Sequence, residues 1–213
     1  MRFDAVLFDV DGTLIHSSPG ILATLRGTFE RMGVDIAGVD LRKYLGPPLR
    51  RSFARHFSTG EQVEEAVLLY RRLYQEEGQY ACGLFPGVRE MLAALYERGV
   101  CLCTATSKPV QVVRPMLAHL GIERFFTMVG GAALDSSLDT KTAVMQHVLA
   151  QPFLKGKRVL MVGDRQDDLQ GAADCGVPAA AVLYGYGPRE ELEPFQPSFF
   201  APDCASLTNY ILG

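Results

Sequence analysis

The chain has 213 residues, of which 48% are hydrophobic and 21% charged, and its formal net charge is −3 at pH 7. The mildly acidic balance disfavours nucleic acid as a partner, and no apolar run approaches the roughly 20 residues that span a bilayer. Asp4 and Asp9 break the early apolar stretch, so we expect no secretory signal, and five cysteines without a CxxC pair indicate a reducing, cytoplasmic setting. The sequence leaves the oligomeric state open, as monomer or homodimer.

Five short apolar segments predict the strands of one sheet. Each is rich in Val, Leu, Ala or Phe and nearly continuous, as in parallel strands that are covered on both faces. The segments span residues 5–10, 100–106, 125–131, 158–164 and 179–185. Helical patterns alternate with them over residues 87–99, 109–121, 140–151 and 165–176. This alternation predicts an α/β fold with a doubly wound, Rossmann-like parallel sheet.

Residues 16–83 interrupt this alternation after the first strand. They contain helical patterns and no strand-like run, and a Gly-Pro-Pro loop lies within residues 43–51. We therefore expect an all-helical cap domain over 16–83, inserted into a core domain made of 1–15 and 84–213. The proline-rich C-terminal stretch 194–211 is expected to pack its aromatic residues on the sheet edge.

Polar side chains gather where the predicted strands end. Asp9 and Asp11 follow the first strand with one residue between them, so both carboxylates project the same way. Two like charges at that spacing repel unless a cation lies near or one is protonated. In open α/β sheets the ligand crevice lies at the carboxyl ends of the strands. The other polar residues expected there are Thr106, Ser107, Lys108, Lys141, Asp164, Asp167 and Asp168.

Other motifs for an acidic pair do not match. An EF-hand beginning at Asp9 needs glycine at its sixth position and glutamate at its twelfth, where this chain has Leu14 and Gly20. Neither a Walker phosphate loop nor a GxGxxG fingerprint occurs in the sequence. A carboxylate cluster that holds Mg²⁺ remains, because this cation prefers hard oxygen ligands.

Four segments resemble, in order and spacing, the motifs of haloacid dehalogenase-like phosphohydrolases. They read FDVDGTL, TATSKP, LDTKTAVMQHVL and VGDRQDDLQGA. The chain is most similar to the phosphoglycolate phosphatase branch, which carries a helical cap, and the segments GPPL and LYGYGPREEL share that similarity. The resemblance implies a Mg²⁺-dependent phosphatase that hydrolyses a small phosphorylated metabolite through an aspartyl-phosphate intermediate.

The resemblance also implies a role for each residue of the core motifs. Asp9 is the expected nucleophile, and Asp11 the general acid and then the base. Thr106 and the backbone amide of Ser107 are expected to bind the phosphoryl oxygens, and Lys141 to supply a fixed positive charge. Gly12 is expected to let the chain turn tightly under the phosphate.

The expected metal ligands are Asp9, Asp164 and the backbone carbonyl of Asp11. Asp168 is expected to act on the metal directly or through water, ahead of its neighbour Asp167, because adjacent helical residues do not share a face. In the cap, Lys43 and Arg50 are candidates for contact with the far end of an anionic substrate.

Several functions remain open at this stage. Phosphoglycolate-like compounds, sugar phosphates and nucleoside monophosphates, the last implying a 5′-nucleotidase, fit the same motifs. A phosphomutase similar to β-phosphoglucomutase uses the same core residues and is the alternative reaction. A non-catalytic binding module on this fold predicts erosion of the motif residues, and none of them is eroded.

Overall fold

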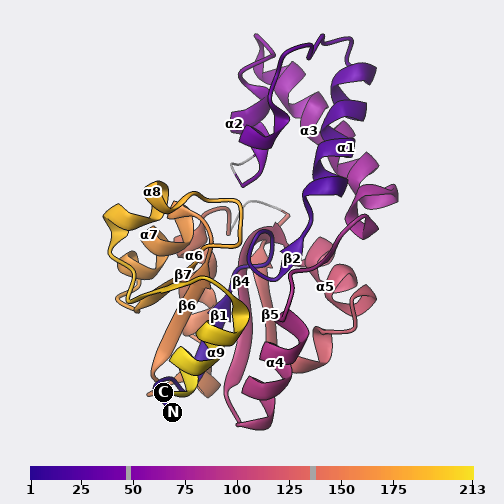
Figure 1. The fold of residues 1–213 in the computed structure, drawn as a ribbon. Helices are drawn as coiled ribbons and strands as arrows, with labels where there is room; N and C mark the ends of the chain where they lie inside the picture. The colour runs from indigo at the N-terminus through magenta and orange to yellow at the C-terminus, as the bar shows by residue number, and fades with distance from the viewer. Residues whose placement is uncertain (47–48, 135–137) are drawn as a thin grey trace. The chain divides into compact units, whose positions relative to one another are not determined.

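The computed structural model describes residues 1–46, 49–134 and 138–213, which form two compact units (Figure 1). One unit combines Met1–His16 with Leu84–Gly213, and the other is Ser17–Gly83. Pro47 and Pro48 of the expected Gly-Pro-Pro loop lie outside the described residues. No helix in the described ranges combines the length and the apolar character needed to cross a membrane.

The larger unit is built around a six-stranded sheet of order β5-β4-β1-β6-β7-β8, in which every neighbouring pair is parallel. Its strands are β1 (Ala5–Phe8), β4 (Cys101–Pro109), β5 (Met128–Ala132), β6 (Val159–Gly163), β7 (Ala179–Val182) and β8 (Phe199–Ala201). Each of the five predicted segments overlaps one of these strands, and β4 and β5 extend beyond the predicted ends at residues 106 and 131. The predicted doubly wound parallel sheet is therefore confirmed.

Three strands were not predicted. The edge strand β8 lies in the C-terminal stretch, where only packing on the sheet edge was expected, and it pairs with β7 through Ala180 and Phe199. Its three residues are too few to form a recognisable apolar run. β2 (Ile15–His16) and β3 (Gly83–Leu84) form a separate two-stranded sheet and are shorter still.

Helices cover both faces of the six-stranded sheet (Figure 1). They are α4 (Val88–Glu97), α5 (Val110–His119), α6 (Lys141–Leu149), α7 (Gln166–Asp174), α8 (Arg189–Leu192) and α9 (Cys204–Leu212), with short 3-10 helices at Glu123–Phe125, Pro152–Leu154 and Glu193–Phe195. On the α6 and α7 face, Leu7 of β1 packs in one cluster with Val144 and Leu169. All four residues of β1 are buried, which explains its continuous apolar sequence.

The smaller unit is helical. Its elements are α1 (Ser18–Arg31), α2 (Leu49–Phe53), α3 (Gly60–Glu76) and 3-10 helices at Leu41–Tyr44 and Gly78–Tyr80. An aromatic core joins the three α-helices, since the ring of Phe53 lies 5.5 Å from that of Phe29 and 6.2 Å from that of Tyr70. The Thr59 hydroxyl accepts a hydrogen bond from the Gln62 backbone N–H and thereby caps the start of α3.

Candidate active site

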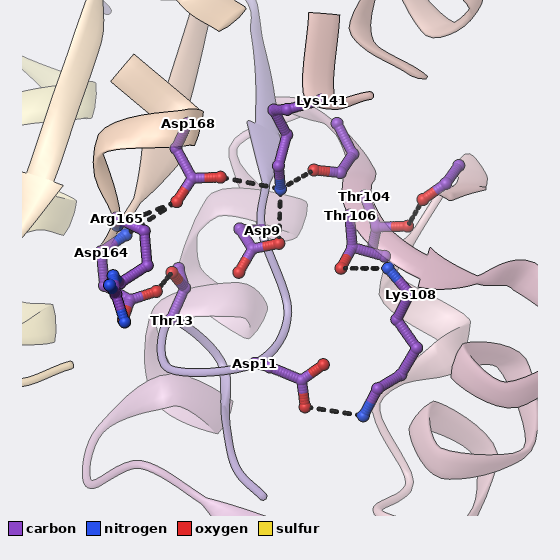
Figure 2. A network of polar contacts seen from close by, with 12 residues as sticks. Asp9, Asp11, Thr13, Thr104, Thr106, Lys108, Lys141, Asp164, Arg165 and Asp168 are labelled. Atoms are coloured by element: carbon purple, nitrogen blue, oxygen red, sulfur yellow. Dashed lines mark hydrogen bonds and ion pairs between the residues drawn. The ribbon is translucent and has the colours of Figure 1, made fainter. Parts of the chain in front are cut away.

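The chain order of the strands places a topological switch point beside β1. From β1 the chain continues to β4 and β5 on one side, and it then returns to β6, β7 and β8 on the other side. Ligands in open α/β sheets bind at such a point, outside the carboxyl ends of the strands. Asp9 directly follows β1, Thr106 lies near the end of β4, and Asp164 directly follows β6. Figure 2 shows that these side chains converge.

Lys141 is at the centre of this network. Its Nζ lies 2.6 Å from Oδ1 of Asp9, 2.7 Å from Oδ1 of Asp168 and 2.9 Å from the carbonyl oxygen of Ala105. An ammonium group has three N–H donors, so these three acceptors satisfy it fully. The Thr140 hydroxyl caps α6 by accepting from the Ala143 N–H, which makes Lys141 the first residue of the helix.

The environment keeps Lys141 charged although it is only 7% exposed. Burial by itself lowers the pKa of the ammonium group, but the carboxylates of Asp168 and Asp9 outweigh this effect and raise it above its ordinary value. Lys141 therefore supplies a permanent positive charge at a defined position. Its predicted role in phosphoryl transfer stays a prediction.

Asp9 is a buried carboxylate with one oxygen held in place. Burial raises its pKa to about 6, against the opposing effect of Lys141, and repulsion from Asp168 adds to the rise. Lys141 pairs with Oδ1, whereas Oδ2 accepts no hydrogen bond from the part of the chain that the structure describes. The second oxygen is therefore available to a metal ion or to an electrophile.

Asp164 is fixed by two hydrogen bonds. Its Oδ1 accepts from the Thr13 hydroxyl at 3.1 Å, and its Oδ2 accepts from the backbone N–H of Tyr186 at 2.8 Å. Burial raises the pKa of Asp164 well above its ordinary range, and the charges of Asp9 and Asp168 add to the rise. The ionised form of this residue thus needs compensation from a nearby positive charge.

Asp168 uses both of its carboxylate oxygens within the protein. Oδ1 pairs with Lys141, and Oδ2 accepts the backbone N–H groups of Asp164 and Arg165 at 3.1 and 3.0 Å. It thereby connects the lysine to the turn that follows β6. Its neighbour Asp167 is exposed, and the action of Asp168 on the metal stays a prediction.

The three buried carboxylates fit a divalent cation. Asp9, Asp164 and Asp168 each offer an oxygen, and these oxygens lie within 4.8 Å of one another. Lys141 balances only part of their charge, and repulsion among the carboxylates adds to the rise that burial causes in the pKa values of Asp9 and Asp164. Oxygen donors of this kind are what Mg²⁺ prefers. Asp11 was predicted to bind the metal through its backbone carbonyl, and its side chain is outside this cluster.

Two glycines allow the backbone to approach Asp164 closely. Gly12 has φ +91°, and a Cβ atom there would lie 2.2 Å from Oδ2 of Asp164. A Cβ atom on Gly185 would lie 2.3 Å from Cβ of Asp164 and 2.5 Å from the carbonyl oxygen of Gly12. Side chains at either position would displace the carboxylate. Gly12 was expected to permit a tight turn, whereas Gly185 was part of a noted segment to which no role was given.

Asp11 lies at the edge of the network and forms an ion pair that the sequence did not predict. Its Oδ1 lies 2.8 Å from Nζ of Lys108 (Figure 2). The Thr106 hydroxyl accepts a hydrogen bond from the Lys108 backbone N–H at 3.3 Å, and Ser107 between them is exposed. The sequence offered one signal for this ion pair: Lys108 lies two residues after Thr106, at the predicted end of a strand.

The two cap candidates belong to the helical unit. Lys43 is exposed in the 3-10 helix Leu41–Tyr44. The guanidinium group of Arg50 makes two hydrogen bonds to the Glu64 carboxylate, at 2.5 and 2.9 Å. Part of its hydrogen-bonding capacity is therefore used inside the unit, and substrate contact by either residue stays a prediction.

Comparison with known proteins identifies the family. The family profile described as haloacid dehalogenase-like hydrolase matches residues 6–182, which include Asp9, Lys141, Asp164 and Asp168. The chain belongs to this family. The predicted resemblance and the predicted hydrolase class are thereby confirmed. A haloacid dehalogenase-like family hydrolase from Streptococcus pneumoniae superposes with a TM-score of 0.91 over 98% of both chains, at 31% identity.

The curated relatives of this haloacid dehalogenase-like chain are named for different activities. A 5′-nucleotidase of Pseudomonas aeruginosa is 35% identical over 97% of this chain and 95% of its own length. Tyrosine-protein kinase PtkA of Mycobacterium tuberculosis is 39% identical over 85% of this chain, which spans 62% of the kinase. A phosphoglycolate phosphatase of Pseudomonas savastanoi is 29% identical over 95% of this chain and 77% of its own length.

Proposed function

We propose that this haloacid dehalogenase-like hydrolase is a phosphatase for a small phosphomonoester, with Asp9 as the phosphoryl acceptor. One observation carries the proposal. Oδ1 of Asp9 is held by a buried, permanently charged lysine, Oδ2 is free of hydrogen bonds from the described residues, and the carboxylate lies close to two further buried carboxylates. A carboxylate oriented in this way is suited to nucleophilic attack on phosphorus.

In the first step, Oδ2 of Asp9 attacks phosphorus and the bond from phosphorus to the leaving oxygen breaks. Asp11 gives its proton to that oxygen, so the alcohol departs neutral. The Lys141 ammonium, the Thr106 hydroxyl and the Ser107 amide are the proposed partners of the charge that spreads over the phosphoryl oxygens. In the second step, water attacks the aspartyl-phosphate, Asp11 takes a proton from that water, and Asp9 is restored as inorganic phosphate leaves.

Asp9 and Asp164 are the proposed carboxylate ligands of Mg²⁺, together with the backbone carbonyl of Asp11. When bound, the cation supplies the positive charge that lets a carboxylate and a phosphate dianion approach each other. We assign Asp168 an indirect part, because both of its oxygens already accept hydrogen bonds or an ion pair within the protein. It positions Lys141 and the backbone that carries Asp164.

The substrate class is proposed from the relatives. The 5′-nucleotidase matches at higher identity than the phosphoglycolate phosphatase and over nearly its whole length, which favours a nucleoside 5′-monophosphate. Phosphate release should be measured on nucleoside monophosphates, phosphoglycolate, sugar phosphates and p-nitrophenyl phosphate, with Mg²⁺ or with EDTA. We expect Mg²⁺-dependent release with a clear preference for one substrate. Asp9→Asn should abolish it, whereas Asp167→Asn, which changes an exposed neighbour of the cluster, should not.

Phosphoryl transfer to a hydroxyl group in place of water is the second candidate. The similarity to the protein named tyrosine-protein kinase PtkA favours it, as does the shared chemistry of an aspartyl-phosphate, which a mutase also uses. Hydrolysis and transfer can be distinguished in the same reaction mixtures with a tyrosine-containing peptide added as an acceptor. The mixtures are analysed for isomerised sugar phosphates and for phosphotyrosine on the peptide. A transferred phosphoryl group in excess of released phosphate would favour this candidate over hydrolysis.

A further inference from the structure

Lys108 connects two parts of the proposed catalytic machinery that are distant in sequence. It lies near the end of β4, and its Nζ reaches Oδ1 of Asp11 at 2.8 Å, 97 residues away. Its backbone N–H donates to the Thr106 hydroxyl at 3.3 Å. The family resemblance assigned Lys108 no role, and the function proposed above does not use it.

This ion pair is more buried than an ordinary surface pair. The side chain of Lys108 is 13% exposed and that of Asp11 is 19% exposed, so water screens their attraction less than it does for exposed groups. The ammonium group also lies 3.7 Å from the Met116 sulfur, which places the end of the side chain against α5. Both partners are thus largely buried, and the end of the lysine side chain also contacts α5.

We propose that Lys108 is a positioning residue that orients the Asp11 carboxylate for hydrolysis of the aspartyl-phosphate; this inference rests on the proposed function. Lys108 occupies Oδ1, while Oδ2 accepts no hydrogen bond from the described residues. As water attacks phosphorus, one water proton passes to Oδ2 of Asp11 and the bond between phosphorus and Asp9 breaks. The electron pair of that bond restores the Asp9 carboxylate, and inorganic phosphate is released.

The substrate p-nitrophenyl phosphate isolates this step. Its leaving group departs without a proton, so phosphorylation of Asp9 does not need Asp11, whereas hydrolysis of the intermediate does. In Lys108→Met the side chain is one atom shorter, stays unbranched and loses its charge. We expect a burst of p-nitrophenolate close to the enzyme concentration, followed by turnover slowed about 100-fold, the usual scale of acid–base assistance.

The kinetic constants give an independent readout. When hydrolysis of the intermediate limits turnover, kcat and KM fall together and kcat/KM changes little, because kcat/KM reports only the first step. A loss of fold would lower the burst amplitude and would not produce this pattern. Lys108→Arg retains the charge and should restore most of kcat without a burst. Lys155→Met, which removes an exposed lysine from the same unit, should behave like the wild type.

Each of the following results would overturn the assignment. A rise in KM without a burst would show that Lys108 contacts the substrate. A burst in Lys108→Arg as large as in Lys108→Met would show that its charge does not position Asp11. A wild-type enzyme that releases no phosphate from any substrate refutes the proposed function and this inference with it. An active wild type and a burst-free Lys108→Met refute the inference alone.

Discussion

Removal of the Lys141 charge should destabilise the fold in a pH-dependent manner. Lys141→Met leaves Asp9 and Asp168 buried without their shared cation, and also removes a hydrogen bond to Ala105. Breaking a buried ion pair by loss of one partner costs about 3–5 kcal/mol. We expect a loss of this size in the free energy of unfolding at pH 7, with the larger values favoured because two carboxylates lose their partner.

The pH dependence follows from the protonation of those carboxylates. Without Lys141, the pKa of Asp9 in the folded state rises further above the unfolded value of about 3.9, from its already raised value of about 6. A raised folded-state pKa means that stability is present below the unfolded pKa and lost as pH rises. One carboxyl kept protonated costs about 1.4 kcal/mol per pH unit above that value, and Asp9 with its pKa of about 6 already carries part of this cost in the wild type, so the additional loss in the variant is larger at pH 7 than at pH 5. The variant should thus recover part of its stability at pH 5.

Urea denaturation followed by circular dichroism measures this effect, at pH 5 and pH 7 and with EDTA throughout so that no divalent cation replaces the lysine. Lys155→Met is the matched control, because Lys155 is exposed, and it should change the free energy of unfolding by less than about 0.5 kcal/mol. A loss below about 1 kcal/mol at pH 7, or an equal loss at both pH values, would refute the reasoning from buried charge.

Three further variants test the surroundings of Asp164 and the surface of the sheet. Gly185→Ala should cost about 1–3 kcal/mol of stability and weaken Mg²⁺ binding in calorimetric titration, because its Cβ would lie 2.3 Å from Cβ of Asp164. Thr13→Val removes the hydroxyl that donates to Asp164 and should cost about 1–3 kcal/mol in urea denaturation. Asp4→Asn should lower Tm more at pH 7 than at pH 2, since hydrogen bonds from Arg158 lower the pKa of Asp4, and stability from a lowered pKa is lost as pH falls.

Each of these variants has a control variant, in which the same type of substitution is made at a more exposed or open position. Gly60→Ala places a Cβ in open space, so it should not weaken Mg²⁺ binding. Thr142→Val removes a hydroxyl that donates to the exposed Asp174 carboxylate and should have little effect. Asp167→Asn removes an exposed acid and should change Tm little. Equal effects in a variant and its control would contradict the assigned contact.

The parallel sheet explains why so much of the architecture was predictable. Buried parallel strands need continuous apolar sequences, so five of the six strands of the sheet could be found directly. Parallel strands end at one edge, which brings Asp9, Thr106 and Asp164 together without any knowledge of the tertiary structure. The edge strand Phe199–Ala201 was missed because it has only three residues and lies between Pro197 and Pro202.

Some features of the site leave no mark in the sequence. The Tyr186 contact with Asp164 uses a backbone N–H, which every residue except proline carries. The pairing of Lys108 with Asp11 depends on how far a long side chain extends across the end of the sheet. By contrast, the sequence could predict that only one of Asp167 and Asp168 is turned toward the cluster, because neighbouring residues of one helix face different directions.

The most direct test of the account is whether Asp9 accepts the phosphoryl group. Wild type and Asp9→Asn should be mixed with a ³²P-labelled substrate from the phosphate-release panel and quenched in acid, and the label on the protein then measured and located by peptide mapping. We predict label on the wild-type peptide that contains Asp9, removable by hydroxylamine, and none on the folded Asp9→Asn variant. Label on Asp9→Asn, or undiminished phosphate release by that variant, would contradict the central claim.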